Sequence, residues 1–122
     1  MHSQDFARVF DAQIARSMDV LKTKGDEYAT ENDVLHNFKA AAGLNNVPES
    51  EALWGMITKH IVSLSDMVKH NPNDFEMAVW DEKITDSINF LILLKAIAVE
   101  AHWNSQPEQA QLININKENP SA

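Results

Sequence analysis

Apolar residues recur every three or four positions along most of this chain, a spacing typical of amphipathic α-helices. The first predicted helix covers residues 5–24 and carries the ladder Phe6, Phe10, Ile14, Met18 and Leu21. We expect Gly25 to end it, because glycine commonly follows the last turn of a helix. A second, short helix is predicted between Asp33, which can cap it, and Gly43.

Two longer helices are predicted in the second half. The third begins near Pro48, whose missing amide proton does no harm in a first turn. Its apolar face consists of Leu53, Met56, Ile57, His60, Ile61, Leu64, Met67 and Val68. The fourth runs from about Asp74 to Trp103, after the break at Asn71–Asn73. No stretch alternates apolar and polar residues over the length of a strand, so the sequence predicts an all-α fold.

The last helix is apolar nearly all round between Ile88 and Val99, and such a helix has to be covered on most sides. We expect a single four-helix-bundle-like domain over residues 1–104, covered further by other copies of the chain in a homo-oligomer. Residues 105–122 are rich in Gln, Asn, Pro and Ser, a composition that predicts a flexible C-terminal tail.

Three polar residues interrupt the apolar pattern of the last helix. Glu82, Asp86 and Asn89 follow i, i+4, i+7 spacing and therefore share one line along it. We expect this line to be at least partly buried. A buried carboxylate is costly unless it is paired or bound to a cation. The line therefore indicates either a ligand or metal site, or internal pairing with Lys59, Lys83 or His60.

Composition narrows the function classes. The chain has 122 residues, no cysteine and a formal net charge of −8. The missing cysteines exclude disulfides and thiolate zinc sites. The acidic balance disfavours nucleic acid polymers, which require clustered Lys and Arg. We expect no membrane association and a cytoplasmic location, because no apolar run is long enough to span a bilayer and the N-terminus does not resemble a signal peptide.

Other polar clusters are candidates for ligand binding. Lys24, Asp26, Glu27 and Tyr28 close the first helix, and Asp33, Asn37 and Lys39 follow on the short one. A line of Lys59, Ser63 and Asp66 edges the third helix, with His60 on its apolar face. Each cluster also has a purely structural interpretation: a capped turn, surface ion pairs and a hydrogen-bonded core histidine, respectively.

The motifs KGDEYA, DxxxNFKAAA, LWGMxxKHxVSxxDM and VWDEKITDxxNFLxLL occur in that order over about residues 20–100. Together they resemble a family of small phage-encoded helical proteins. The closing helix also resembles the last core helix of the MazG-like nucleotide pyrophosphohydrolases and of related nucleotide-modification-associated phage domains. The resemblance implies an all-α nucleotide-handling protein whose carboxylates hold Mg²⁺ against a nucleoside triphosphate. Where MazG-like enzymes present an EExxE run, this chain has KHIVSLSD.

Carried over by residue, the resemblance implies that Glu82 and Asp86 are the acidic pair of the closing helix and that Asn89 is the polar position one turn on. Only Asp66 can add a carboxylate from the preceding helix, so we expect one metal ion held by Asp66, Glu82 and Asp86, with Glu27 or His60 as general base. The predicted ligand-binding residues are Lys24, Tyr28, Asn37, Lys39, Lys59, Ser63 and Asn89. The expected function is a Mg²⁺-dependent nucleoside triphosphate pyrophosphohydrolase. One alternative is a non-catalytic sponge that sequesters signalling nucleotides of bacterial immunity, with Tyr28, Phe38 or Trp54 stacking on the base. The other is a structural or interaction bundle without a small ligand.

Overall fold

The computed structural model describes residues 1–28 and 33–105, and for residues 24–28 it describes the helix but not the side chains. Four α-helices occupy the described chain: α1 (Ser3–Tyr28), α2 (His36–Asn45), α3 (Glu49–Met67) and α4 (Met77–Ser105). A 3₁₀ turn, η1 (Pro72–Asp74), precedes α4. No strand occurs in these residues, which confirms the prediction of an all-α fold.

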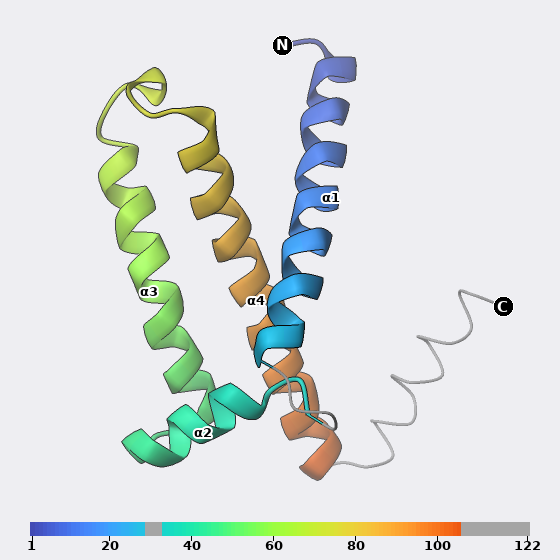
Figure 1. Ribbon diagram of the computed structural model, residues 1–122, viewed down its shortest axis with the longest axis vertical. Coiled ribbons are helices and arrows are strands. Elements are labelled where there is room, and N and C mark those ends of the chain that lie inside the picture. The colour runs from blue at the N-terminus through green and yellow to red at the C-terminus, as the bar shows by residue number, and fades with distance from the viewer. Residues whose placement is uncertain (29–32, 106–122) are drawn as a thin grey trace, which may run out of the picture.

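The three long helices lie side by side, with α4 between α1 and α3 (Figure 1). Helices α3 and α4 form an antiparallel hairpin joined through η1, while α1 runs in the same direction as α4. Helix α2 lies across the lower end of α3. Helix α2 is short, and only α1, α3 and α4 run along the length of the molecule. The four-helix-bundle and MazG-like arrangement therefore stays a prediction.

The hydrophobic core lies where α2, α3 and the second half of α4 meet. Its buried members are Leu35, Phe38, Leu53, Ile57 and Ile97. Half-buried side chains of α3 and α4 pack around them, including Met56, Phe90, Leu93 and Leu94. No described side chain of α1 belongs to this cluster, and among the described helices α1 packs mainly on α4.

Two predicted helix ends are wrong. Helix α1 continues through Gly25 to Tyr28, and α2 continues through Gly43 to Asn45. A glycine inside a helix costs only about 1 kcal/mol relative to alanine, so neighbouring turns can carry the helix past it. Helix α2 ends instead at Asn46, which adopts φ 53°. The amide nitrogens of Asn46 and Val47 then bond to the carbonyl oxygens of Gly43 (3.4 Å) and Ala42 (3.0 Å).

The apolar circumference between Ile88 and Val99 is covered in part by the chain itself. Ile97 is buried, whereas Leu91 and Ile92 remain about half exposed. The homo-oligomer stays a prediction. No helix in the described part of the chain is both long and apolar enough to cross a membrane. The tail was predicted for residues 105–122; Ser105 belongs to α4, and residues 106–122 lie outside the described residues.

Candidate α1–α4 groove

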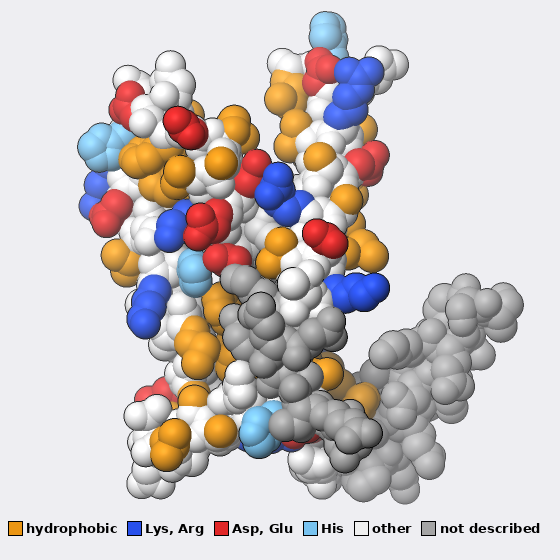
Figure 2. All heavy atoms as spheres, viewed as in Figure 1, with side chains coloured by type: hydrophobic (Ala, Val, Ile, Leu, Met, Phe, Trp, Pro, Cys, Tyr) orange, Lys and Arg blue, Asp and Glu red, His pale blue; other side chains and the backbone are white. Residues whose placement is uncertain are grey.

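A groove runs between α1 and the first half of α4. Its deeper part has a volume of about 460 Å³ and is lined by Arg16, Val20, Ala78, Asp81, Glu82, Thr85 and Asp86. A second hollow of about 580 Å³ continues toward the N-terminus of α1 and shares Arg16, Val20 and Asp81 with the first. We call the two together the α1–α4 groove. Figure 2 shows acidic side chains over the middle of α4, with basic ones close by.

The charges in the groove come mostly from one helix. Asp81, Glu82 and Asp86 fall within two turns of α4, and all three line the groove. Arg16 reaches across from α1, with its Nη2 atom 3.4 Å from Oδ2 of Asp81. Both members of this ion pair are partly exposed, at 51% and 31% of their side-chain area. With Asp19 of α1, four carboxylates and one guanidinium line the groove and leave it acidic, so it favours a cation or a ligand that brings one.

Polar contacts hold α1 against α4 below the groove. Gln13 donates hydrogen bonds from Nε2 to Oγ1 of Thr85 (2.9 Å) and to Oγ of Ser17 (3.0 Å). Asn89 donates from Nδ2 to the carbonyl oxygen of Ser17 (3.1 Å). Thr85, Ser17 and Asn89 are all buried. The Asn89 amide therefore has a structural partner, while its Oδ1 atom has no hydrogen-bond partner among the described residues.

The predicted polar line is partly buried, as expected. Asp86 is 9% exposed and Asn89 6% exposed, whereas Glu82 is exposed at the groove. On the side of Asp86 toward α3 lies His60, whose Nδ1 is 3.9 Å from Oδ2 of Asp86. The His60 ring also packs against Phe90, with a centroid distance of 5.3 Å. Nδ1 of His60 is buried and makes no hydrogen bond within the described chain.

The predicted metal ligands are not equally placed. Glu82 and Asp86 line the same groove. Asp66 is 71% exposed and lies 3.9 Å from Lys69, outside the residues that line the groove. Among the described side chains, no group of three or more His, Asp or Glu residues is arranged to hold a metal ion. The Mg²⁺ site therefore stays a prediction, and only two of its three proposed ligands share a cavity.

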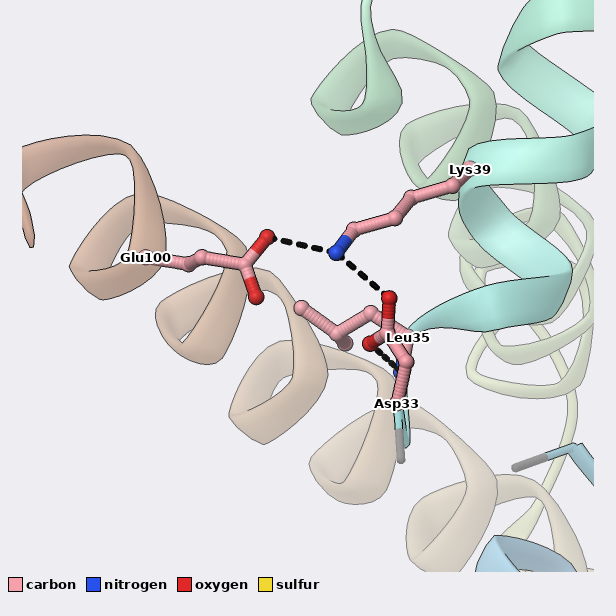
Figure 3. Close-up of polar contacts among 4 residues, drawn as sticks. All are labelled: Asp33, Leu35, Lys39 and Glu100. Carbon is pink, nitrogen blue, oxygen red and sulfur yellow. Dashed lines mark hydrogen bonds and ion pairs between the residues drawn. The ribbon is translucent and has the colours of Figure 1, made fainter. Parts of the chain in front are cut away.

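Lys39 lies in an ion-pair network far from the groove (Figure 3). Its Nζ atom is 2.6 Å from Oδ2 of Asp33 and 2.8 Å from Oε1 of Glu100. Asp33 also accepts a hydrogen bond from the Leu35 amide (2.9 Å), just before α2 begins. The hydrogen bond from Lys39 is the main cause of the lowered pKa of Asp33, and the hydrogen bond from the Leu35 amide is the next. The hydrogen bonds to Asp33 and Glu100 in turn raise the pKa of Lys39. Lys39 therefore belongs to a structural network.

Other predicted ligand residues are scattered. The side chains of Lys24, Glu27 and Tyr28 lie outside the described residues, although the last turns of α1 carry them. Asn37 and Lys59 are exposed on α2 and α3, and Ser63 is half-buried. The idea that Phe38 stacks on a base is wrong, because Phe38 is 2% exposed in the core; Trp54 remains exposed.

Five polar residues that line the groove are not among the predicted site residues: Arg16, Asp81 and Thr85, with Gln13 and Asp19 in the second hollow. Arg16 belongs to an ordinary polar face of α1, and nothing in its spacing distinguishes it from a solvated arginine. Asp81 and Thr85 were detectable, because they lie one position before Glu82 and Asp86 and repeat the same i, i+4 step. Which helix faces them is a tertiary fact that a local pattern does not contain.

No protein-family model matches this chain, and no curated protein or solved structure is significantly similar to it. The groove offers carboxylates for a divalent cation and a guanidinium for a phosphate. His60 does not line the groove but lies on the α3 side of its buried carboxylate, Asp86.

Proposed function

We propose that the chain is a nucleotide-handling protein that binds a nucleoside triphosphate, or a related phosphorylated nucleotide, in the α1–α4 groove and hydrolyses it with Mg²⁺. One observation carries this proposal: Glu82 and Asp86 line the same groove as Arg16, and His60 lies against Asp86. A small phosphorylated ligand is compatible with a cavity of this size.

The donor set fits a Mg²⁺ ion that arrives with its nucleotide. Such an ion usually keeps several waters and binds one or two protein carboxylates together with substrate phosphates. Glu82 and Asp86 supply that number, so the missing third carboxylate does not count against the ion. When bound, Mg²⁺ would neutralise charge on the transferred phosphate. Arg16, already at the groove wall, would contact phosphate oxygens in place of Asp81.

In this proposal His60 would act as general base through its position beside Asp86, from which its Nδ1 is 3.9 Å away. A proton on Nδ1 would face Asp86, which leaves Nε2 to accept a proton from water. The water oxygen then forms the new bond to phosphorus, and pyrophosphate leaves with the electron pair of the broken phosphorus–oxygen bond. Asp86 stabilises the imidazolium that results, as a carboxylate beside a catalytic histidine does in other hydrolases.

A second function, a non-catalytic nucleotide sponge, is favoured by the finding that no three acidic or histidine side chains of the described chain are arranged to hold a metal ion. A binder needs phosphate contacts and a base pocket but no assembled metal centre. Arg16 with the exposed Lys59 would then contact the phosphates. Both functions predict nucleotide binding and differ in turnover.

Thermal stability measured against a nucleotide panel, with and without Mg²⁺, tests the proposal. A ligand that binds only the folded protein at ten times its Kd stabilises it by about 1.4 kcal/mol. We expect a nucleotide with Mg²⁺ to raise Tm, and Asp86→Asn and Glu82→Gln to abolish the rise. Asp11→Asn and Glu76→Gln change exposed acids away from the groove and should respond like the parent. A parent protein indifferent to every nucleotide would leave the structural-bundle alternative.

A further inference from the structure

Helix α1 carries a stripe of apolar side chains that the described part of the chain leaves largely exposed. Its members and their exposed fractions are Phe6 62%, Val9 52%, Phe10 57%, Ile14 42% and Met18 68%. We call these five residues the α1 stripe. Figure 2 shows hydrophobic side chains along the upper part of α1. Spacings of three and four residues place them on neighbouring positions of one helix surface.

The stripe is open because, among the described helices, α1 packs mainly against α4, and the two separate toward the N-terminus of α1 (Figure 1). Gln13 and Ser17 make the polar contacts with α4. Phe6, Val9 and Phe10 lie on the same side of α1 but beyond these contacts, where the two helices separate, and Ile14 and Met18 turn away from α4. The ladder that specifies α1 in the sequence is therefore mostly unburied.

We propose that a second copy of this chain packs on the α1 stripe, forming an isologous dimer in which two α1 helices lie antiparallel. Taking about 200 Å² for a large side chain, the exposed fractions leave on the order of 500 Å² of apolar surface on each α1. Complete burial of both stripes would remove about 1,000 Å² from solvent, close to the minimum for a biological interface and typical of a weak or moderate dimer. Apolar patches of about 500 Å² are among the largest on a monomer and are often functional.

A second copy fits better than a membrane. The six charged side chains between Asp5 and Lys22 alternate in sign along α1 as three acids and three bases. An interfacial membrane helix instead needs an excess of Lys and Arg on its polar face. At 3.6 residues per turn, these charges fall opposite the stripe. In a dimer related by a two-fold axis through the stripe, the charges of one α1 therefore do not face like charges of the other α1, despite the net charge of −8 on each chain.

The dimer would also brace the groove. Val9 belongs both to the stripe and to the upper hollow of the groove, and α1 forms one wall of that hollow. A partner on the stripe fixes the end of α1 that α4 does not hold. The same surface therefore serves assembly and the shape of the site, although the dimer does not depend on the proposed nucleotide chemistry.

Sedimentation velocity of the full chain at about 5–100 µM, a range that spans weak to tight dimers, tests the proposal. We expect twice the chain mass of 13.7 kDa. Phe10→Glu puts two charges into the interface and should weaken association by about 100-fold or more, because buried unpaired charge is strongly unfavourable. The matched control is Trp54→Glu, a similarly exposed aromatic residue on α3 (53%), which should leave the mass unchanged. Circular dichroism checks that both variants remain helical.

A cross-linking variant keeps the test decisive if Phe10→Glu does not fold. The chain has no cysteine, so Ile14→Cys and Trp54→Cys each introduce one unique thiol. A short bismaleimide should link the Ile14→Cys chains covalently into dimers and leave the Trp54→Cys chains without a covalent cross-link. A folded 13.7 kDa parent across the concentration range, an assembly that survives Phe10→Glu, or cross-linking at residue 54 in place of residue 14 would each overturn the proposal.

Discussion

Truncating Leu53 should remove a large part of the stability of this protein. Leu53 is fully buried (0% exposed) on α3, in a cluster with Phe38 and Ile57. Leucine-to-alanine changes at such sites cost about 2–5 kcal/mol, from lost burial and from the cavity that remains. Only seven apolar residues of the described chain are buried, so few neighbours can shift to fill the space. We expect about 3 kcal/mol for Leu53→Ala, against a total of about 5–15 kcal/mol for a typical domain.

Urea and thermal unfolding followed by circular dichroism measure this loss, at one fixed protein concentration because assembly shifts apparent stability. A 3 kcal/mol loss lowers Tm by about 10–25 °C for a domain of this size. Leu44→Ala is the matched control, since Leu44 is 89% exposed on α2 and its truncation should change stability by less than about 0.5 kcal/mol. Equal effects of the two truncations would refute the assignment of the core to the contact of α2, α3 and α4.

Three further outcomes are expected. Asp33 has a lowered pKa, chiefly through its hydrogen bond from Lys39, so its stabilising contribution is complete above its unfolded pKa of 3.8 and disappears as pH falls through the folded value. Unfolding free energies from pH 7 to pH 2 should therefore show the difference between the parent and Asp33→Asn shrinking in acid; a constant difference would count against this pairing. Lys59→Met should leave stability unchanged, because Lys59 is exposed and forms no ion pair with another described residue. It should weaken nucleotide affinity about tenfold or more if Lys59 contacts phosphate, and titration calorimetry distinguishes this from a purely structural lysine. Thr85→Val removes one acceptor of Gln13 and should cost about 0.5–1.5 kcal/mol in urea unfolding, so a neutral result would show that this bond does not help to hold α1 on α4.

The sequence predicts the helices well because their signal is local. Each helix has its own apolar period, and no competing strand pattern exists, so type and approximate position follow from the chain alone. The ends at Gly25 and Gly43 were wrong for a related reason. Glycine weakens a helix by a small amount, and whether the helix stops depends on the turns on both sides. At α2 the stop came from Asn46, which tolerates a positive φ.

What covers each apolar face could not be predicted in the same way. The ladder from Phe6 to Met18 predicts an amphipathic helix correctly but does not say whether α4 or another molecule covers it. The structure leaves this face largely exposed and partly covers the apolar stretch of α4 for which subunit contacts were expected. Burial is a property of tertiary packing, which periodicity along one helix does not specify.

The candidate site was predictable where one helix carries it. Glu82 and Asp86 lie one turn apart, so their shared groove follows from helical geometry. Arg16 and the contact between His60 and Asp86 join helices far apart in sequence, and only the fold brings them together. Lys39 has favourable chemistry for a phosphate, but two carboxylates already engage it.

The most direct measurement of the central claim is ³¹P NMR of the protein incubated with nucleoside triphosphates and Mg²⁺. If Glu82 and Asp86 hold the ion and His60 takes the proton, the triphosphate signals should be replaced by those of a monophosphate and pyrophosphate. Asp86→Asn and His60→Gln should each lower that rate by about 100-fold, within the range that a general base contributes, while Asp11→Asn keeps the parent rate. Nucleotide retained without turnover would instead identify a sponge. Neither product nor retained nucleotide, with any triphosphate tested, would contradict the assignment of the α1–α4 groove to nucleotides.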